Sequence, residues 1–134
     1  MKKTLFTMFS LSALVAVSCQ KDPDVQRVEP QKLLGKWLLE RAVEETYSPA
    51  TTLTDREEYL GEPGDSIVFR PNNVLYSYDG PYMEETEYRL LDNNRLRIEQ
   101  EEWTIEALNE QELTLVQDET EMNERYVIRL FLVR

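Results

Sequence analysis

Apolar and polar residues alternate nearly one by one along most of the chain beyond residue 36. A period of two is typical of strands that bury one face, whereas an amphipathic helix needs apolar residues three or four positions apart. Turn-forming groups such as Asp79-Gly80-Pro81 separate the alternating stretches. The pattern therefore predicts an all-β fold of eight strands, at residues 36–44, 65–70, 74–78, 83–91, 95–100, 102–108, 112–117 and 125–133.

The links after the second predicted strand are short, and short links join antiparallel neighbours. The strands therefore form an antiparallel meander, which can hide its two edges by closing into a barrel. The last predicted strand, 125–133, is apolar on both faces and suits the seam of such a barrel. An open sandwich remains the alternative. We thus expect a lipocalin-like β-barrel domain over residues 32–134.

The long link at residues 45–64 interrupts this regular pattern. Loops of this length are usually lids, binding loops or disordered segments. Within the link, residues 54–60 predict a short helix, because Thr54 can cap it and Glu57 can act as the reciprocal partner. A helical turn is also expected at residues 29–34, with Pro30 at its first position.

The first 18 residues have the pattern of an export signal. Lys2 and Lys3 precede an apolar run at residues 5–17, which is shorter than the roughly 20 residues of a membrane-spanning helix. Small residues, including Ser18, then lead to Cys19. The site fits removal of a lipoprotein signal, but it also fits ordinary signal peptidase, and an uncut signal is a third alternative.

Cys19 is the only cysteine of the chain. An unpaired cysteine in an exported protein calls for an explanation, which lipid attachment would supply. The segment resembles a bacterial lipoprotein signal, so we expect acyl chains on Cys19 to hold the protein at the outer membrane of the cell envelope. Residues 19–31 would form the tether. Asp22 and Asp24 resemble a surface-display signal of the Bacteroidota, and the periplasmic and surface faces both stay open.

The chain has 15 basic and 26 acidic residues, a net charge of −11. Nucleic acid is excluded as an expected partner, because its recognition needs a basic surface. Anionic lipid would repel the folded domain, which is therefore expected to stand away from the bilayer on its tether.

Candidate catalytic chemistry is limited, because the chain has no histidine and its one cysteine precedes the folded part. These absences exclude histidine-dependent triads and His/Cys zinc sites. Paired carboxylates acting on a glycan are one alternative, with candidates at Glu84, Glu85, Glu87, Glu99, Glu101 and Glu102. A calcium site is another, with candidates at Asp118, Glu119, Glu121 and Glu124. Charge runs are usually solvated, so we expect no enzyme, no metal and no cofactor.

Four tyrosines are the more interesting set. Tyr78 and Tyr82 flank one turn, and Tyr47 and Tyr59 lie in the long link. If the link and the turn share a barrel rim, these side chains can form a patch that binds a small ligand or a partner. The alternative is that they only pack the link and the hairpin onto the barrel.

The Leu-Gly-Lys-Trp segment at residues 34–37 resembles the Gly-x-Trp opening of lipocalins. The chain is most similar to lipocalin-like domain lipoproteins of the Bacteroidota. The resemblance implies that Gly35 and Trp37 close one barrel end beneath an arginine of the last strand. Arg129 is the first choice for this structural role and Arg134 the second.

The domain is shorter than typical ligand-carrying lipocalins. An eight-stranded barrel is near the limit between a filled interior and room for one ligand, and four bulky residues are predicted to point inward: Trp37, Phe69, Tyr76 and Trp103. We therefore expect a binding or accessory module that recognises a small ligand or partner at its rim. The alternative is a structural or interaction subunit of an envelope complex with no small ligand.

Overall fold

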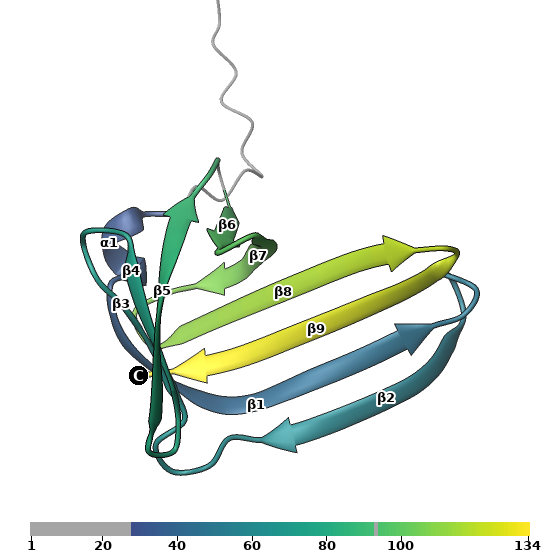
Figure 1. Cartoon of the computed structure of the whole chain (residues 1–134), viewed down its shortest axis with the longest axis horizontal. Helices are drawn as coiled ribbons and strands as arrows, with labels where there is room; N and C mark the ends of the chain where they lie inside the picture. Colours follow the sequence, from purple (N-terminus) through teal and green to yellow (C-terminus); the bar gives the residue numbers. More distant parts are fainter. Residues whose placement is uncertain (1–27, 93) are drawn as a thin grey trace, which may run out of the picture.

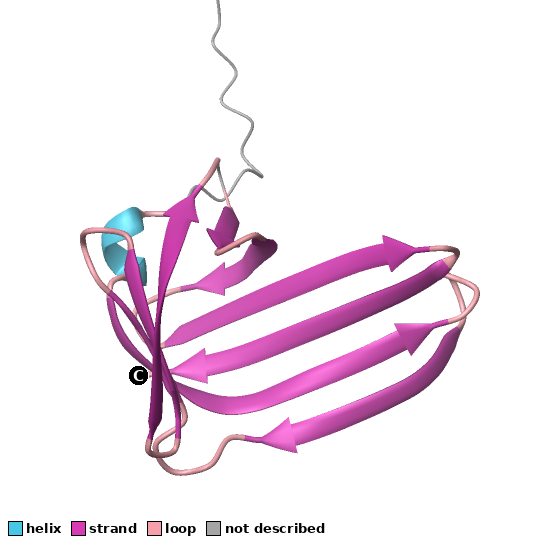
Figure 2. Ribbon diagram, in the orientation of Figure 1, coloured by secondary structure: helices cyan, strands magenta, loops and turns pink. Residues whose placement is uncertain are grey.

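The computed structural model describes residues 28–92 and 94–134, which form an all-β domain with one helical turn (Figures 1 and 2). Cys19, the predicted signal and most of the predicted tether lie outside the described residues. Helix α1 spans Pro30–Leu33, as expected. The strands are β1 (Gly35–Tyr47), β2 (Leu53–Leu60), β3 (Ser66–Phe69), β4 (Val74–Asp79), β5 (Tyr82–Leu90), β6 (Arg95–Ile98), β7 (Glu101–Leu108), β8 (Glu112–Glu121) and β9 (Glu124–Val133).

Eight of these strands close into a barrel. The order is β1-β3-β4-β5-β6-β7-β8-β9, and β9 pairs back onto β1. All neighbouring pairs are antiparallel. Leu38 pairs with Ser66 of β3 and with Val133 of β9, so these two strands lie on opposite edges of β1. The predicted meander barrel is therefore confirmed, and β9 lies at the seam as expected.

Four strands continue beyond the barrel wall as an open sheet, the four long strands on the right of Figure 1. Residues 35–38 of β1 pair with β3, whereas residues 41–47 pair with β2 along the same edge. Strand β7 accompanies β8 only as far as Val116. We call this four-stranded extension, in the order β8-β9-β1-β2, the arm.

The helix predicted at residues 54–60 is wrong, because these residues form β2. Residues 41–47 of β1 leave one edge of backbone donors and acceptors free, and β2 pairs with that edge. Thr54 Oγ1 donates to the carbonyl oxygen of Thr46 at 3.0 Å instead of capping a helix. The predicted 20-residue link is therefore a hairpin strand between two shorter turns.

Gly61 lets the chain pass from β2 back to the barrel at very close range. Its amide donates to the carbonyl oxygen of Glu40 at 2.9 Å, beside the bulge that interrupts β1 between Leu39 and Arg41. A Cβ atom at position 61 would lie 1.8 Å from the carbonyl oxygen of Leu39. Only glycine fits at this crossing.

The barrel interior is filled by side chains. The largest fully buried residues are Trp37, Phe69, Leu33, Leu96, Leu113, Leu115 and Leu132. The Phe69 and Tyr88 rings pack edge to face at 4.9 Å between centroids. Trp103 packs against this core as a half-buried residue. Tyr76 does not point inward as predicted, since Leu75 is the buried residue at 3% exposure and Tyr76 occupies the opposite face of β4.

Trp37 and an arginine close the α1 end of the barrel. Trp37 Nε1 donates to the carbonyl oxygen of Leu33 at 2.8 Å. The guanidinium of Arg134 lies 3.9 Å from the centre of the Trp37 ring and donates at 2.7 Å to the carbonyl oxygens of Lys32 and Leu34. The first choice, Arg129, was therefore wrong for this role, because it lies further back along β9, on the arm.

Candidate binding surface

The four tyrosines predicted to share a rim do not meet. Ser66 pairs with both Leu38 and Tyr78, whereas Tyr47 lies nine residues beyond Leu38 on β1. At the strand rise of about 3.3 Å per residue, this separation is about 30 Å along the sheet. Tyr78 and Tyr82 lie together on the β4–β5 hairpin, but on opposite faces of it.

A small apolar pocket opens at the end of the barrel opposite α1. It has a volume of about 300 Å³, and its walls come from β1, β3, β4 and β9: Leu39, Asp65, Ser66, Ile67, Ser77, Tyr78, Asp79 and Leu130. This size is at the lower limit of ligand pockets. We call it the mouth pocket. Of the four predicted rim tyrosines, it includes only Tyr78.

The arm has two faces, and the alternation of side chains along each strand shows which residues belong to each face. Leu132 belongs to the barrel core, so Leu130, Ile128 and Tyr126 share its side of β9. The residues paired with them on the neighbouring strands therefore also continue the barrel lining. We call this side the inner face of the arm, and the opposite side, which carries Val127 and Arg129, the outer face.

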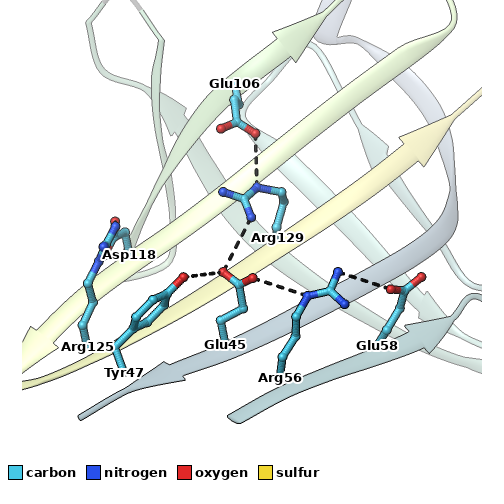
Figure 3. A network of polar contacts seen from close by, with 8 residues as sticks. All are labelled: Glu45, Tyr47, Arg56, Glu58, Glu106, Asp118, Arg125 and Arg129. Atoms are coloured by element: carbon cyan, nitrogen blue, oxygen red, sulfur yellow. Dashed lines mark hydrogen bonds and ion pairs between the residues drawn. The ribbon is translucent and has the colours of Figure 1, made fainter. Parts of the chain in front are cut away.

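A network of charges and hydrogen bonds covers the outer face (Figure 3). Arg129 bridges Glu106 and Glu45, with N–O distances of 3.2 and 3.9 Å. Arg56 contacts Glu45 and Glu58, each at 3.4 Å. Beneath these side chains, two valines are nearly inaccessible: Val43 at 3% exposure and Val127 at 4%. Paired side chains thus cover the middle of the outer face, whereas Leu60, at the end of the edge strand β2, is exposed.

Asp118 and Arg125 form a further ion pair of the outer face. Arg125 Nε donates to Asp118 Oδ1 at 2.8 Å, and Arg125 also lies 5.3 Å from the centre of the Tyr47 ring. The hydrogen bond from Arg125 and the positive charges of Arg125 and Arg129 hold the pKa of the Asp118 carboxyl below its usual value. Hydrogen bonding to Glu45 raises the pKa of Tyr47.

The inner face is different, because it carries carboxylates that have no ion-pair partner among the described residues. Strand register places six carboxylates and no lysine or arginine on the described part of this face: Glu44, Asp55, Glu57, Glu119, Glu121 and Glu124. None of the six has an ion-pair partner within residues 28–92 and 94–134.

The raised pKa values of two exposed tyrosines reflect the negative charge of the inner face. Tyr59 is 47% exposed and Tyr126 is 42% exposed. The hydrogen bond from Tyr59 to Glu57, with the nearby charges of Glu57, Glu44 and Asp55, raises the pKa of Tyr59 to about 12. A hydrogen bond to Glu124 likewise raises the pKa of Tyr126.

Apolar residues connect the inner face to the mouth pocket. Ile128 and Leu130 are half-buried on the same side of β9 as the fully buried Leu132. Leu130 also lines the mouth pocket, and its partner Ala42 belongs to the inner face. The pocket and the inner face therefore form one continuous surface. Acids two residues apart at Asp55 and Glu57 of β2, and at Glu119 and Glu121 of β8, were a sequence signal for it, but their shared side depends on strand register.

Four of the six carboxylates considered for catalysis lie together elsewhere, whereas Glu102 pairs with Arg95 and Arg97. Glu85, Glu87, Glu99 and Glu101 border a wide, open depression of about 860 Å³ beside β5. Thr86 Oγ1, at the same place, is buried without a hydrogen-bond partner in the described structure.

The calcium candidates do not converge on one point. Asp118 belongs to the outer face, whereas Glu119 and Glu121 belong to the inner face. In the part of the chain that the structure describes, no group of three or more acidic, cysteine or histidine side chains is arranged to hold a metal ion.

No protein-family model, no curated protein and no solved structure matches this chain. The barrel is thus described from its own strand pairing, which agrees with the lipocalin-like architecture at the level of fold. Of the described segments, none forms a helix long and apolar enough to cross a membrane.

Proposed function

We propose that this protein is a binding module of the bacterial cell envelope, without catalytic activity, that holds a protein partner at the mouth pocket and the adjoining inner face. One observation carries the proposal. The barrel is filled, yet an apolar pocket opens where an uncovered sheet face begins. Uncovered apolar surface of this kind typically marks an interaction site.

A protein partner is favoured over a small ligand enclosed by the barrel. The inward side chains of Trp37, Phe69 and Leu115 fill the interior where a lipocalin would hold its cargo. The mouth pocket is small and opens onto a four-stranded sheet rather than into the barrel. Such a surface suits one apolar side chain of a partner together with its flanking residues.

The place of action follows from the beginning of the chain. The basic start, the apolar run and Cys19 support an acylated N-terminus that anchors the protein to the outer membrane, as in the lipocalin-like lipoproteins of the Bacteroidota. Mass spectrometry of the mature N-terminus tests this part. Acyl mass on Cys19 is expected, and a Cys19→Ala variant should leave the membrane fraction. An unmodified thiol at the N-terminus would contradict the anchor.

Photo-crosslinking in intact cells tests the binding surface. A photoreactive amino acid at Ser77, which shares the inward side of β4 with Leu75, samples the mouth pocket, and the same group at Glu110, in the exposed β7–β8 turn, is the control. We expect a discrete protein adduct from position 77 that disappears when Leu130→Gln makes the pocket polar. Equal adducts from both positions, or a bound small molecule found by native mass spectrometry, would contradict the proposal.

A further inference from the structure

The inner face of the arm is a sheet face that no described element covers. Tyr59 and Tyr126 stand exposed on it, and Ile128 and Leu130 are half-buried. The outer face of the same four strands buries its valines beneath paired charges. A molecule that covers the inner face would therefore bury apolar surface without breaking ion pairs, which is not true of the outer face.

The charges of the inner face favour a positively charged partner. Six carboxylates lie within a sheet about 15 Å wide, given the strand spacing of about 4.8 Å. Glu44 pairs directly with Glu57 across β1 and β2, where like charges destabilise the sheet. A cationic partner would relieve this repulsion, and the phosphates of nucleic acid or anionic lipid would increase it.

The remaining side chains favour a polypeptide as the source of the positive charge. Tyr59 and Tyr126 offer aromatic faces on which lysine or arginine side chains can stack. The mouth pocket beside Leu130 needs an apolar group, which inorganic cations lack and which polyamines offer only as short methylene chains between charges. From Leu130 to Tyr126, the inner face extends about 13 Å along β9, the span of about five extended residues.

Building on the proposed function, we propose that the partner presents an extended segment rich in lysine or arginine, which lies on the inner face while a neighbouring apolar residue enters the mouth pocket. The acidic face provides the attraction and the pocket fixes the position. This division assigns charge recognition to the arm and apolar recognition to the barrel.

Fluorescence anisotropy with two labelled peptides tests this inference on the purified protein. The probes are octalysine and octalysine with an N-terminal tryptophan. The inner-face variant removes three of the six carboxylates, with Glu44→Gln, Glu57→Gln and Glu119→Gln. A matched variant removes the same number of charges from exposed positions elsewhere, with Glu85→Gln, Glu101→Gln and Glu110→Gln. Urea unfolding curves confirm that both variants fold.

The inner-face variant should bind octalysine about tenfold more weakly, because three exposed charge contacts together account for about one decade in affinity. The matched variant should change binding less than about twofold. Equal weakening in both variants would reduce the effect to general attraction by an acidic chain and overturn the inference. Unchanged binding in both would overturn it as well.

The two peptides separate this inference from the proposed function. The tryptophan should strengthen binding, and Leu130→Gln should remove that gain. If octalysine binding depends on the inner face but the tryptophan adds nothing, the charge recognition stands and the role of the mouth pocket fails. If the tryptophan strengthens binding but the inner-face charges have no effect, the proposed function stands and the cationic partner fails.

Discussion

At the scale of single residues, Arg134 shows how much of a contact a short sequence motif can predict. The sequence predicted that Trp37 lies beneath an arginine of the last strand, and in the structure the arginine over the ring is Arg134, one residue beyond the end of β9. It could not predict which arginine, because the answer depends on the register between β1 and β9. A bulge after Leu39 shifts that register by one residue, and the bulge is visible only in the paired strands.

Arg134→Ala should destabilise the fold by about 1–2 kcal/mol, because it removes a cation–π contact and two hydrogen bonds to backbone carbonyls. Urea unfolding measures this loss. Arg129→Ala is the comparison, and since its contact with Glu45 is long, at 3.9 Å, and its partner Glu106 is 52% exposed, we expect a smaller loss. A larger loss for Arg129→Ala would return the closing role to that residue.

Tyr59 should keep its proton to unusually high pH, with a pKa of about 12, because Glu57 accepts its hydrogen bond and neighbouring carboxylates oppose a phenolate. Since the pKa is raised in the folded state, this contribution to stability is complete below the unfolded pKa of 10.0 and disappears as pH rises through 12. Glu57→Gln should lower the pKa of Tyr59, measured by NMR of the ring carbons. Glu58→Gln, on the outer face of β2, should leave it nearly unchanged.

At the scale of elements, the arm was the part that the sequence analysis missed. Most barrel strands were predicted within one or two residues, because their alternation and turns are local signals. Strand β2 was predicted as a helix, since Thr54 and Glu57 have the spacing of a capping box. Pairing with the free edge of β1 stabilised a strand at residues 53–60 more than the local capping preference stabilised a helix. This edge exists because β1 extends to Tyr47, and the length of β1 cannot be predicted from residues 53–60.

Gly61→Ala should destabilise the protein by about 2–3 kcal/mol, because the new Cβ would overlap the backbone carbonyl of Leu39. Thermal unfolding measures the loss. Gly80→Ala is a matched control with nothing within 4 Å of its Cβ, so it should cost only the penalty for its φ of 55°, about 1 kcal/mol. Similar losses in both variants would contradict a special role for the crossing at Gly61.

The Asp118–Arg125 pair should stabilise the arm at neutral pH but not in acid. The pKa of Asp118 is lowered in the folded state, so its contribution is present above the unfolded value of 3.8 and is lost as pH falls through the lower folded value. Asp118→Asn should therefore lower the urea midpoint at neutral pH, and the difference from the original protein should shrink in acid. A difference that persists unchanged below both pKa values would show that the pair acts through packing instead.

At the scale of the whole molecule, one sheet has two uses. Where it closes around Trp37, Phe69 and Leu115, it forms a filled barrel that was predictable from apolar alternation and bulky inward residues. Where β1, β2, β8 and β9 extend beyond the barrel, the same lining becomes an exposed acidic surface. The predicted tyrosine rim failed because strand lengths, which set the 30 Å separation of Tyr47 from Tyr78, are not encoded in any short motif.

Side-chain NMR during an octalysine titration tests the central claim most directly, because adjacent residues of β9 point to opposite faces. The account predicts that the Ile128 methyl and Tyr126 ring signals of the inner face shift with added peptide. The Val127 methyl and Tyr47 ring signals of the outer face should remain in place. Equal shifts on both faces, or shifts confined to the depression beside Glu99, would contradict the claim that the inner face is the binding surface.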